Sequence, residues 1–259
     1  MGVNIDVKDR VVIITGAGRG MGLTMAKEFL SHGGGVNLVD LNIPKGVVEE
    51  LSRLGPVRAY EADVRDDARI QQIATDIGKA WGRIDILVNS AGVIYKDLVE
   101  NLDIDSWNRV MNINVSGTML CTRAVVPGMK ANRWGRIINL SSMQAFMGSP
   151  QYSAYTASKA AVIGLTKVWA MELVTYNVTV NALCPSFVRT PLLEGAMKNL
   201  QQREKLTDEE TMERFVSQVP QGRVLEPEEI AFAALFLSSP LAQGITGSSL
   251  VIAAGCLLY

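Results

Sequence analysis

The sequence predicts a doubly wound α/β fold, in which a seven-stranded parallel sheet is flanked by helices on both faces. Short, nearly continuous apolar runs alternate with longer segments of helical periodicity, and such runs are typical of strands buried on both sides. Parallel strands also need crossover connections, which the helical segments supply. The expected strands lie at residues 11–15, 36–39, 57–60, 86–88, 136–140, 178–183 and 249–252.

The composition fits one large domain over residues 1–259. Of the 259 residues, 48% are hydrophobic and 20% are charged, which is enough apolar material for one full core. The formal net charge is −1, so we expect neither nucleic acid nor a membrane surface as a partner. The sequence contains no repeat, low-complexity tract or linker of the kind that separates domains.

Other features of the composition favour a cytoplasmic protein without a metal. Cys121, Cys184 and Cys256 lack the spacing of a disulfide framework or a thiolate metal site, so a reducing cytoplasm is expected. His32 is the only histidine, which argues against a metal centre. The first ten residues show no secretory signal pattern. Residues 230–259 are uncharged, but Ser, Pro and Gly divide them into pieces too short to span a bilayer.

A glycine-rich turn follows the first expected strand. Residues 16–22 read GAGRGMG and lead directly into a helical pattern. Glycine tolerates positive φ and lets the backbone approach a pyrophosphate, while the start of a helix offers unpaired N–H groups. This turn is therefore a candidate site for a dinucleotide, although a glycine-rich stretch by itself is weak evidence.

Asp40 supports a dinucleotide site and indicates which dinucleotide binds. It ends the second expected strand, 24 residues after Gly16, where a carboxylate accepts hydrogen bonds from the adenosine ribose hydroxyls. A carboxylate there repels the 2′-phosphate of NADP, so NAD is the expected cofactor and NADP the less favoured one. Arg19 argues the other way, because a guanidinium binds phosphate well.

The segment from about residue 190 to 223 interrupts the alternation of strands and helices. It contains KNLQQREKLTDEETMERF, which is charged and helix-prone. Such an insertion suits a mobile cover over a substrate site. A solvated helical excursion without a function explains the composition equally well.

Tyr155 and Lys159 stand four residues apart within a long helical pattern that begins near Tyr152. Side chains at positions i and i+4 share a helix face, so the Lys159 ammonium is expected beside the Tyr155 phenol. A free tyrosine has a pKa of about 10, and a neighbouring cation together with the positive nicotinamide ring of NAD⁺ would lower it towards the range of a general acid and base. The pair is therefore a candidate for proton transfer.

Three motifs occur together in this chain. Thr15 to Gly22 match TGxxxGxG, Tyr155 to Lys159 match YxxxK, and Ser142 stands thirteen residues before the tyrosine. In this combination the sequence resembles the short-chain dehydrogenases/reductases over almost its whole length. The resemblance implies a single-domain Rossmann fold, hydride transfer with a nicotinamide cofactor, and no metal.

The resemblance also implies roles for four catalytic residues. Ser142 would hold and polarise the substrate oxygen, and Tyr155 would exchange its proton. Lys159 would tune Tyr155 and bind the nicotinamide ribose, and Asn114, in the segment NINVSG at 112–117 that resembles a helix motif of the family, would support a proton-relaying water. Hydrogen bonds from Ser142 and Tyr155 directed at one oxygen would stabilise the charge that develops there.

Further matches extend the cofactor site. Asp63 and Val64 resemble the adenine contact of the family, residues 89–92 its NNAG motif, and residues 185–191 its PGxxxTP loop. The expected cofactor-binding residues are Gly16, Arg19, Gly20, Met21, Gly22, Asp40, Leu41, Asp63, Val64, Asn89, Ala91, Gly92, Tyr155, Lys159, Pro185, Val188 and Thr190.

The chain departs from the family pattern at three places. NNAG reads NSAG, the PG dipeptide reads Pro185-Ser186, and the usual VDGG near the end reads IAAG at residues 252–255. Ser186 replaces a glycine, so a special backbone angle there is expected to be relaxed, and the cofactor contacts at Val188 and Thr190 become less secure.

Small residues on the helix at 152–175 predict close helix packing between subunits. The resemblance implies a homotetramer, with this helix and the one near 105–131 at one interface and the uncharged C-terminal segment at another.

The predicted function is that of an NAD-dependent oxidoreductase for a small secondary alcohol or ketone, such as a polyol or a cyclic alcohol. The expected substrate residues are Ser142, Gln144 and Tyr155, with Tyr95, Phe146, Gln151, Phe187 and Leu193 as further pocket residues. Two alternatives stay open: an NADPH-dependent 3-oxoacyl-thioester reductase, which has the same motifs, and a non-catalytic dinucleotide-binding regulator. Cofactor preference separates the two enzymes, and inertness towards alcohols and ketones would favour the regulator.

Overall fold

All seven expected strands are present and form one parallel sheet. The structure is a computed structural model that describes residue 5 and residues 7–257. The strands are β1 (Val11–Thr15), β2 (Gly35–Asp40), β3 (Val57–Glu61), β4 (Ile86–Asn89), β5 (Gly135–Leu140), β6 (Val178–Pro185) and β7 (Ser249–Ile252). Their order is β3-β2-β1-β4-β5-β6-β7, and every neighbouring pair is parallel. The doubly wound α/β prediction is confirmed.

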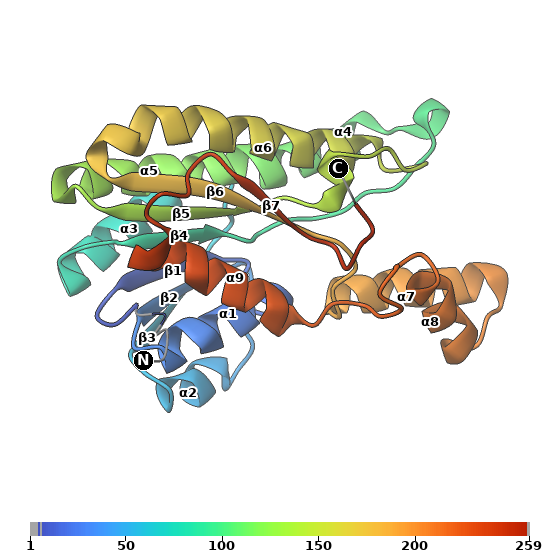
Figure 1. Cartoon of the computed structure of the whole chain (residues 1–259), viewed down its shortest axis with the longest axis horizontal. Helices are drawn as coiled ribbons and strands as arrows, with labels where there is room; N and C mark the ends of the chain where they lie inside the picture. The colour runs from blue at the N-terminus through green and yellow to red at the C-terminus, as the bar shows by residue number, and fades with distance from the viewer. Residues whose placement is uncertain (1–4, 6, 258–259) are drawn as a thin grey trace.

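Helices cover both faces of the sheet (Figure 1). One face carries α1 (Gly20–Ser31), α2 (Val47–Ser52) and α9 (Pro227–Ser238), and the other carries α3 (Asp67–Trp81), α4 (Ile104–Met111), α5 (Thr118–Asn132) and α6 (Ser153–Leu173). Side chains alternate along β1, so Val12 and Ile14 join the core under α1 and α9. Val11 and Ile13 join the core under α3 and α5.

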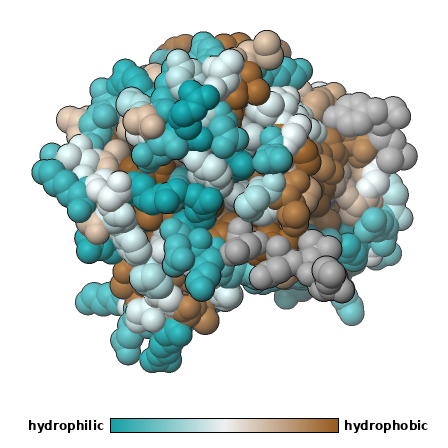
Figure 2. Space-filling view, turned by 60° about the vertical axis from the view of Figure 1, so that its left-hand side comes forward, coloured by the Kyte–Doolittle hydropathy of each residue, from teal (hydrophilic) through white to brown (hydrophobic). Residues whose placement is uncertain are grey.

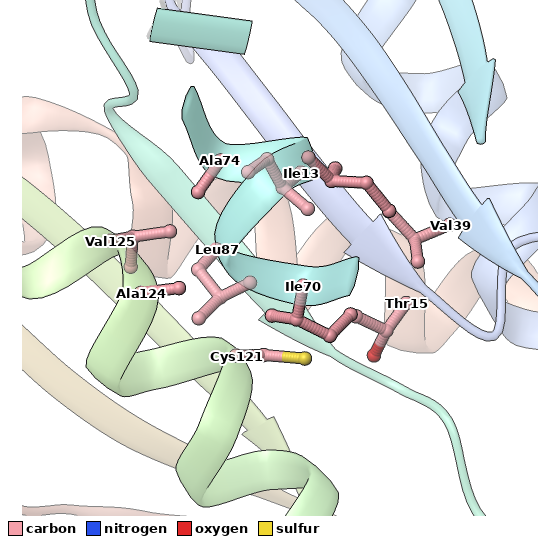
Figure 3. A pocket seen from close by; sticks show the side chains of 10 residues that line it. Ile13, Thr15, Val39, Ile70, Ala74, Leu87, Cys121, Ala124 and Val125 are labelled. Carbon is pink, nitrogen blue, oxygen red and sulfur yellow. The ribbon is translucent and has the colours of Figure 1, made fainter. Parts of the chain in front are cut away.

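The core between the sheet and helices α3 and α5 contains a small void (Figure 3). Its volume of about 10 Å³ is room for roughly one water molecule, and its lining is almost entirely apolar. Thr15 contributes the lining's hydroxyl, and this group already accepts hydrogen bonds from the N–H groups of Ser90 and Ala91 at 3.1 and 3.2 Å. The void is a packing gap, while the Thr15 contacts join the ends of β1 and β4.

The chain reverses its direction of winding between β1 and β4. After β3 it crosses to the opposite side of β1, so the connections at the carboxyl ends of β1 and β4 diverge. In open α/β sheets this divergence leaves a crevice at the carboxyl ends of the strands. The glycine-rich turn after β1 and the NSAG segment after β4 both lie at this edge.

The helix expected near 105–131 is interrupted. A π-helical segment, Asn112–Gly117, separates α4 from α5. The Asn114 side chain bonds to the backbone of Val93, and a Cβ at Gly117 would approach Val64 to 2.6 Å. Tertiary contacts therefore accompany a bulge that sequence periodicity does not reveal.

The charged segment at 190–223 forms two helices, α7 (Pro191–Glu204) and α8 (Asp208–Val216), which stand apart from the two helical layers (Figure 1). A capping box between Thr207 and Glu210 starts α8, and an ion pair of 3.1 Å joins Arg214 to Glu204. Short 3-10 turns complete the structure at Val99–Asn101, Met143–Ala145, Val174–Tyr176 and Pro240–Ala242. Within residue 5 and residues 7–257, no helix is long and apolar enough to cross a membrane.

Candidate active site

A cavity of about 940 Å³ opens at the carboxyl ends of the strands. It reaches from the glycine-rich turn and Asp40 to α6 and α7. Most of the predicted site residues line it: Gly16, Arg19, Gly20, Met21, Gly22, Asp40, Leu41, Asp63, Val64, Ala91, Gly92, Tyr95, Ser142, Gln144, Gln151, Tyr155, Lys159, Pro185, Phe187, Val188, Thr190 and Leu193. The fold therefore brings together residues that lie far apart in the sequence.

Two glycines show why the turn after β1 needs this residue type. Gly16 has φ +67°, and a Cβ there would come within 2.8 Å of the Ala91 backbone. At Gly22, a Cβ would overlap the Gly16 carbonyl oxygen. Both observations reflect a backbone that turns sharply between β1 and α1 with no room for side chains. The bare backbone and the first turn of α1 form a cradle suited to phosphate groups.

Asp40 is held in place by this turn. Its carboxylate accepts a hydrogen bond of 2.8 Å from the Gly18 N–H and a longer one of 3.4 Å from the Asn42 N–H. Among the described residues, no cation lies within ion-pair distance of Asp40, and Arg19 is exposed without an ion pair. The negative charge of Asp40 is therefore presented to the cavity without local compensation.

Helix α6 carries Tyr155 and Lys159 to the wall of the same cavity. The Lys159 ammonium lies 5.6 Å from the centre of the Tyr155 ring and donates a 2.7 Å hydrogen bond to the Leu140 carbonyl at the end of β5. The Ser141 hydroxyl donates to the Lys159 carbonyl at 2.8 Å. These bonds connect α6 to β5, which ends beside Ser142.

Burial, rather than the lysine charge, dominates the proton chemistry of this pair. Desolvation raises the pKa of Tyr155 to about 12, while a hydrogen bond with Ser142 acts in the opposite direction. Desolvation also lowers the pKa of Lys159 to about 8. Lys159 by itself therefore does not bring the Tyr155 pKa down in the protein without ligands. The predicted lowering, which also involves the positive nicotinamide ring of NAD⁺, stays a prediction.

The Asn114 side chain forms hydrogen bonds inside the protein and connects two segments of the site. Its side chain accepts from the Val93 N–H at 2.9 Å and donates to the Val93 carbonyl at 3.0 Å. It also donates to the Ser158 hydroxyl at 3.0 Å, and that hydroxyl donates to the Tyr155 carbonyl at 2.7 Å. Asn114 thus couples the segment after β4 to the turn of α6 that carries Tyr155, and it does not itself line the cavity.

The family follows from a match along nearly the whole chain. Residues 16–256 match a family model described as "Enoyl-(Acyl carrier protein) reductase". The chain belongs to the short-chain dehydrogenase/reductase family. It is 36% identical over 255 residues to the 3-oxoacyl-(acyl-carrier-protein) reductase FabG of Thermotoga maritima, covering 97% of this chain and 99% of that protein.

Two further relatives have different activities. The chain is 34% identical to an NAD-dependent glycerol dehydrogenase of Listeria innocua, over 97% of this chain and 95% of that protein. The crystal structure of levodione reductase superposes with a TM-score of 0.89 at 29% identity, covering 96% of this chain and 97% of that chain. The chain is thus a short-chain dehydrogenase/reductase oxidoreductase that acts on CH–OH groups of small molecules with NAD or NADP.

Besides Asn114, two predicted residues of this short-chain dehydrogenase/reductase lie outside the lining of the cavity. The Asn89 amide donates to the Thr122 hydroxyl at 3.1 Å and to the Asn139 side chain at 2.9 Å, inside the protein. Phe146 follows the short turn Met143–Ala145 and is also absent from the lining. Their roles as cofactor and substrate residues stay predictions.

Ser186 stands where the family pattern has a glycine, and its backbone conformation is one that any residue can adopt. Ser186 has no positive φ, so a glycine is not needed there and the substitution causes no strain. By contrast, Gln151 has φ +73° on the cavity wall, where only glycine is free of strain. The Gln151 carbonyl accepts a 3.0 Å hydrogen bond from the Asp97 N–H, which ties together the two loops on this side of the cavity.

Sequence reasoning missed several charged and aromatic residues of the lining. Tyr152 stands three residues before Tyr155, and its ring lies 6.2 Å from the Tyr155 ring in an edge-on arrangement. Helical spacing could have indicated it. Lys96, Arg109 and Arg203 also line the cavity, but they come from a loop, α4 and α7, so no local pattern connects them.

Proposed function

We propose that this protein is an NAD-dependent dehydrogenase of a small secondary alcohol, such as a polyol or a cyclic alcohol. The observation that carries this proposal is one cavity that holds an uncompensated carboxylate, Asp40, at one end and the Ser142, Tyr155 and Lys159 group at the other. The first selects the cofactor, and the second performs the proton transfer.

The residues present fit a dinucleotide. The glycine turn leaves backbone where a Cβ at Gly16 or Gly22 could not be placed, and Asp40 lines the cavity beside it. The assigned cofactor residues are those predicted from the sequence, with Asp63 and Val64 for the adenine and Pro185, Val188 and Thr190 for the nicotinamide end. When bound, the nicotinamide supplies the hydride acceptor or donor.

In the proposed mechanism, the protein binds the substrate oxygen and moves its proton. Ser142 and Tyr155 direct hydroxyl groups at this oxygen and stabilise its developing charge. In the oxidation direction Tyr155, as the phenolate, takes the proton of the alcohol, and in the reduction direction the phenol gives its proton to the ketone oxygen. Lys159 is buried with its ammonium on Leu140, so its charge acts in a medium of low polarity beside Tyr155. Asn114 positions α6 through Ser158.

The substrate end of the cavity combines apolar walls with a few polar groups. Gln144 stands next to the reacting group, and its Oε1 is buried without a hydrogen-bond partner, which suits a substrate hydroxyl. The remaining assigned lining consists of Tyr95, Gln151, Phe187 and Leu193. We propose that α7 and α8 form the cover at about 190–223, because Phe187 of the wall packs edge-on against Phe215 of α8 at 5.4 Å.

The direct test is absorbance at 340 nm with NAD⁺ or NADP⁺ against polyols, cyclic alcohols, 3-hydroxybutyrate and 3-hydroxyacyl thioesters. We expect turnover with NAD⁺ and at least one small secondary alcohol. A strong preference for NADP⁺ together with thioester turnover would reject the proposal.

Asp40→Asn should shift the cofactor preference. The substitution keeps the shape and an oxygen for the Gly18 N–H but removes the charge that repels a 2′-phosphate. We expect the ratio of kcat/KM for NAD⁺ to that for NADP⁺ to fall by about 100-fold, mainly through better use of NADP⁺. Steady-state kinetics with both cofactors measures this ratio. Glu61→Gln removes an exposed carboxylate beside Asp40 in the β2–β3 register and serves as the control. An equal shift in both variants would contradict the assignment.

One relative favours a second candidate, an NADPH-dependent 3-oxoacyl-thioester reductase. The Thermotoga maritima protein with that activity is 36% identical over almost the full length of both chains. If this chain were such a reductase, Tyr155 would perform the same proton transfer. The uncompensated Asp40 carboxylate argues against NADPH, and the cofactor panel separates the two candidates.

We also propose that the single domain assembles as a homotetramer in the cytoplasm. Val168 and Met171 on α6 are 54% and 78% exposed, and Leu241 and Leu250 in the uncharged C-terminal segment are also exposed. The face shown in Figure 2 has apolar residues gathered on its right-hand side. Sedimentation should give four times the 28.1 kDa chain mass, and a monomer would contradict this assembly.

A further inference from the structure

A cation on the cavity wall has no role in the proposed reaction. Lys96 lies in the loop after β4, lines the cavity, and places its ammonium 4.5 Å from the centre of the Tyr152 ring. Tyr152 in turn packs edge-on against Tyr155 with ring centres 6.2 Å apart. Two short steps therefore connect the Lys96 charge to the residue that exchanges the substrate proton.

The protein leaves this charge without an acidic partner. Among the described residues, Lys96 forms no ion pair. The adjacent carboxylate of Asp97 is engaged elsewhere, because it accepts from the Leu98 N–H at 2.8 Å and from the Tyr95 hydroxyl at 3.2 Å. The Tyr152 ring attracts the ammonium through its π face but does not neutralise it.

The other charges of the cavity are distributed unevenly. The lining carboxylates, Asp40 and Asp63, both belong to the assigned adenosine end. Arg19 belongs to the glycine turn, Arg203 is paired with Glu204 at 2.9 Å, and Lys159 is bound to the Leu140 carbonyl. Arg109 of α4 also lines the cavity and is the second cation that the test must separate from Lys96. Among the described residues, the side of the cavity formed by Lys96 and Tyr152 therefore presents a positive charge to the substrate, and no carboxylate of the lining lies on that side to compensate it.

We propose that Lys96 determines substrate specificity by binding an anionic group, a carboxylate or a phosphate, at the end of the substrate remote from its reacting hydroxyl. The proposal rests on the proposed function and defines its substrate class as a small hydroxy acid or hydroxy phosphate ester. A lysine ammonium supplies three donors and a compact charge for such a group, and the Tyr152 ring restricts where that charge lies.

The test compares substrates that differ in this charge. We would measure kcat/KM with NAD⁺ for 3-hydroxybutyrate against its methyl ester, and for glycerol 3-phosphate against glycerol. The wild-type enzyme should prefer the anionic member of at least one pair, and that pair identifies the group as carboxylate or phosphate. In Lys96→Met this preference should fall about tenfold, through KM rather than kcat, while Lys96→Arg should retain most of it.

Lys130→Met is the matched control, because the Lys130 ammonium also lies over a tyrosine ring, that of Tyr176 at 4.7 Å, and is absent from the cavity lining. It should leave the preference unchanged. A wild-type enzyme that favours the neutral members would overturn the inference while the proposed function stands. If the preference for the anionic substrate survives in Lys96→Met and is lost in Arg109→Met, Arg109 binds the anion. That result would also overturn the inference and leave the proposed function standing. Absence of turnover with every secondary alcohol would reject the proposed function and the inference together.

Discussion

Tyr155→Phe should lower kcat by about 10³-fold, which is the contribution typical of a well-positioned general acid or base. The substitution removes the hydroxyl that exchanges the substrate proton and keeps the half-buried ring in its position on α6. Tyr155 is the residue of the described cavity to which the proposed mechanism gives the proton transfer, so its loss should not be compensated by a neighbouring group. Initial rates at 340 nm measure the effect.

The variant must also be shown to fold and to bind its cofactor. Its melting temperature should stay within a few degrees of wild type, and NADH should still quench its tryptophan fluorescence. Tyr60→Phe is the control, because Tyr60 on β3 is a half-buried tyrosine outside the cavity lining and should be fully active. If Tyr155→Phe retained a tenth of the wild-type activity, the proposed mechanism would be wrong.

Lys159→Met should inactivate the enzyme and at the same time stabilise the fold. Burial lowers the pKa of Lys159 from 10.5 to about 8, so charging this group in the folded protein costs about 3 kcal/mol more than in the unfolded chain. Methionine of similar length removes that cost but leaves the Leu140 carbonyl without its hydrogen bond, a loss of about 1 kcal/mol. We expect a net gain of about 2 kcal/mol at pH 7, or about 5 °C in melting temperature.

The pH dependence distinguishes this explanation from a simple packing effect. The unfolded chain binds the Lys159 proton below pH 10.5 and the folded protein only below about pH 8. The wild type therefore gains stability as the pH rises from about 8 to 10.5, whereas the variant lacks this gain. The difference between the two proteins is largest below pH 8 and closes towards pH 10.5.

Denaturant unfolding at several pH values measures this difference. Lys79→Met changes an exposed lysine on α3 and should alter the free energy of unfolding by less than about 0.5 kcal/mol at any pH. A Lys159→Met variant that is less stable than wild type at pH 7 would show that the ammonium stabilises the fold and would refute the desolvation argument. Its activity should fall by about 10²-fold or more, since the charge beside Tyr155 is lost.

Local pattern was sufficient for the elements and for most of the site. The seven strands were predictable because each is a short apolar run between helical segments, and a parallel sheet needs both faces covered. The glycine turn, Asp40 and the Tyr155–Lys159 pair were predictable because their chemistry depends on spacing along one or two adjacent elements. Ser142 was predictable from the family resemblance. Distances of three to four residues on a helix are fixed by its geometry.

The sequence by itself therefore determined the fold class, the family motifs and most of the predicted residues that line the cavity. Only the tertiary structure decided how those residues behave: that burial raises the pKa of Tyr155, that Asn114 bonds to Val93 and Ser158, and that Asn89 points into the interior. Only the tertiary structure placed Lys96 over Tyr152. Desolvation and contacts of this kind depend on segments that are distant in the chain, so no local periodicity encodes them.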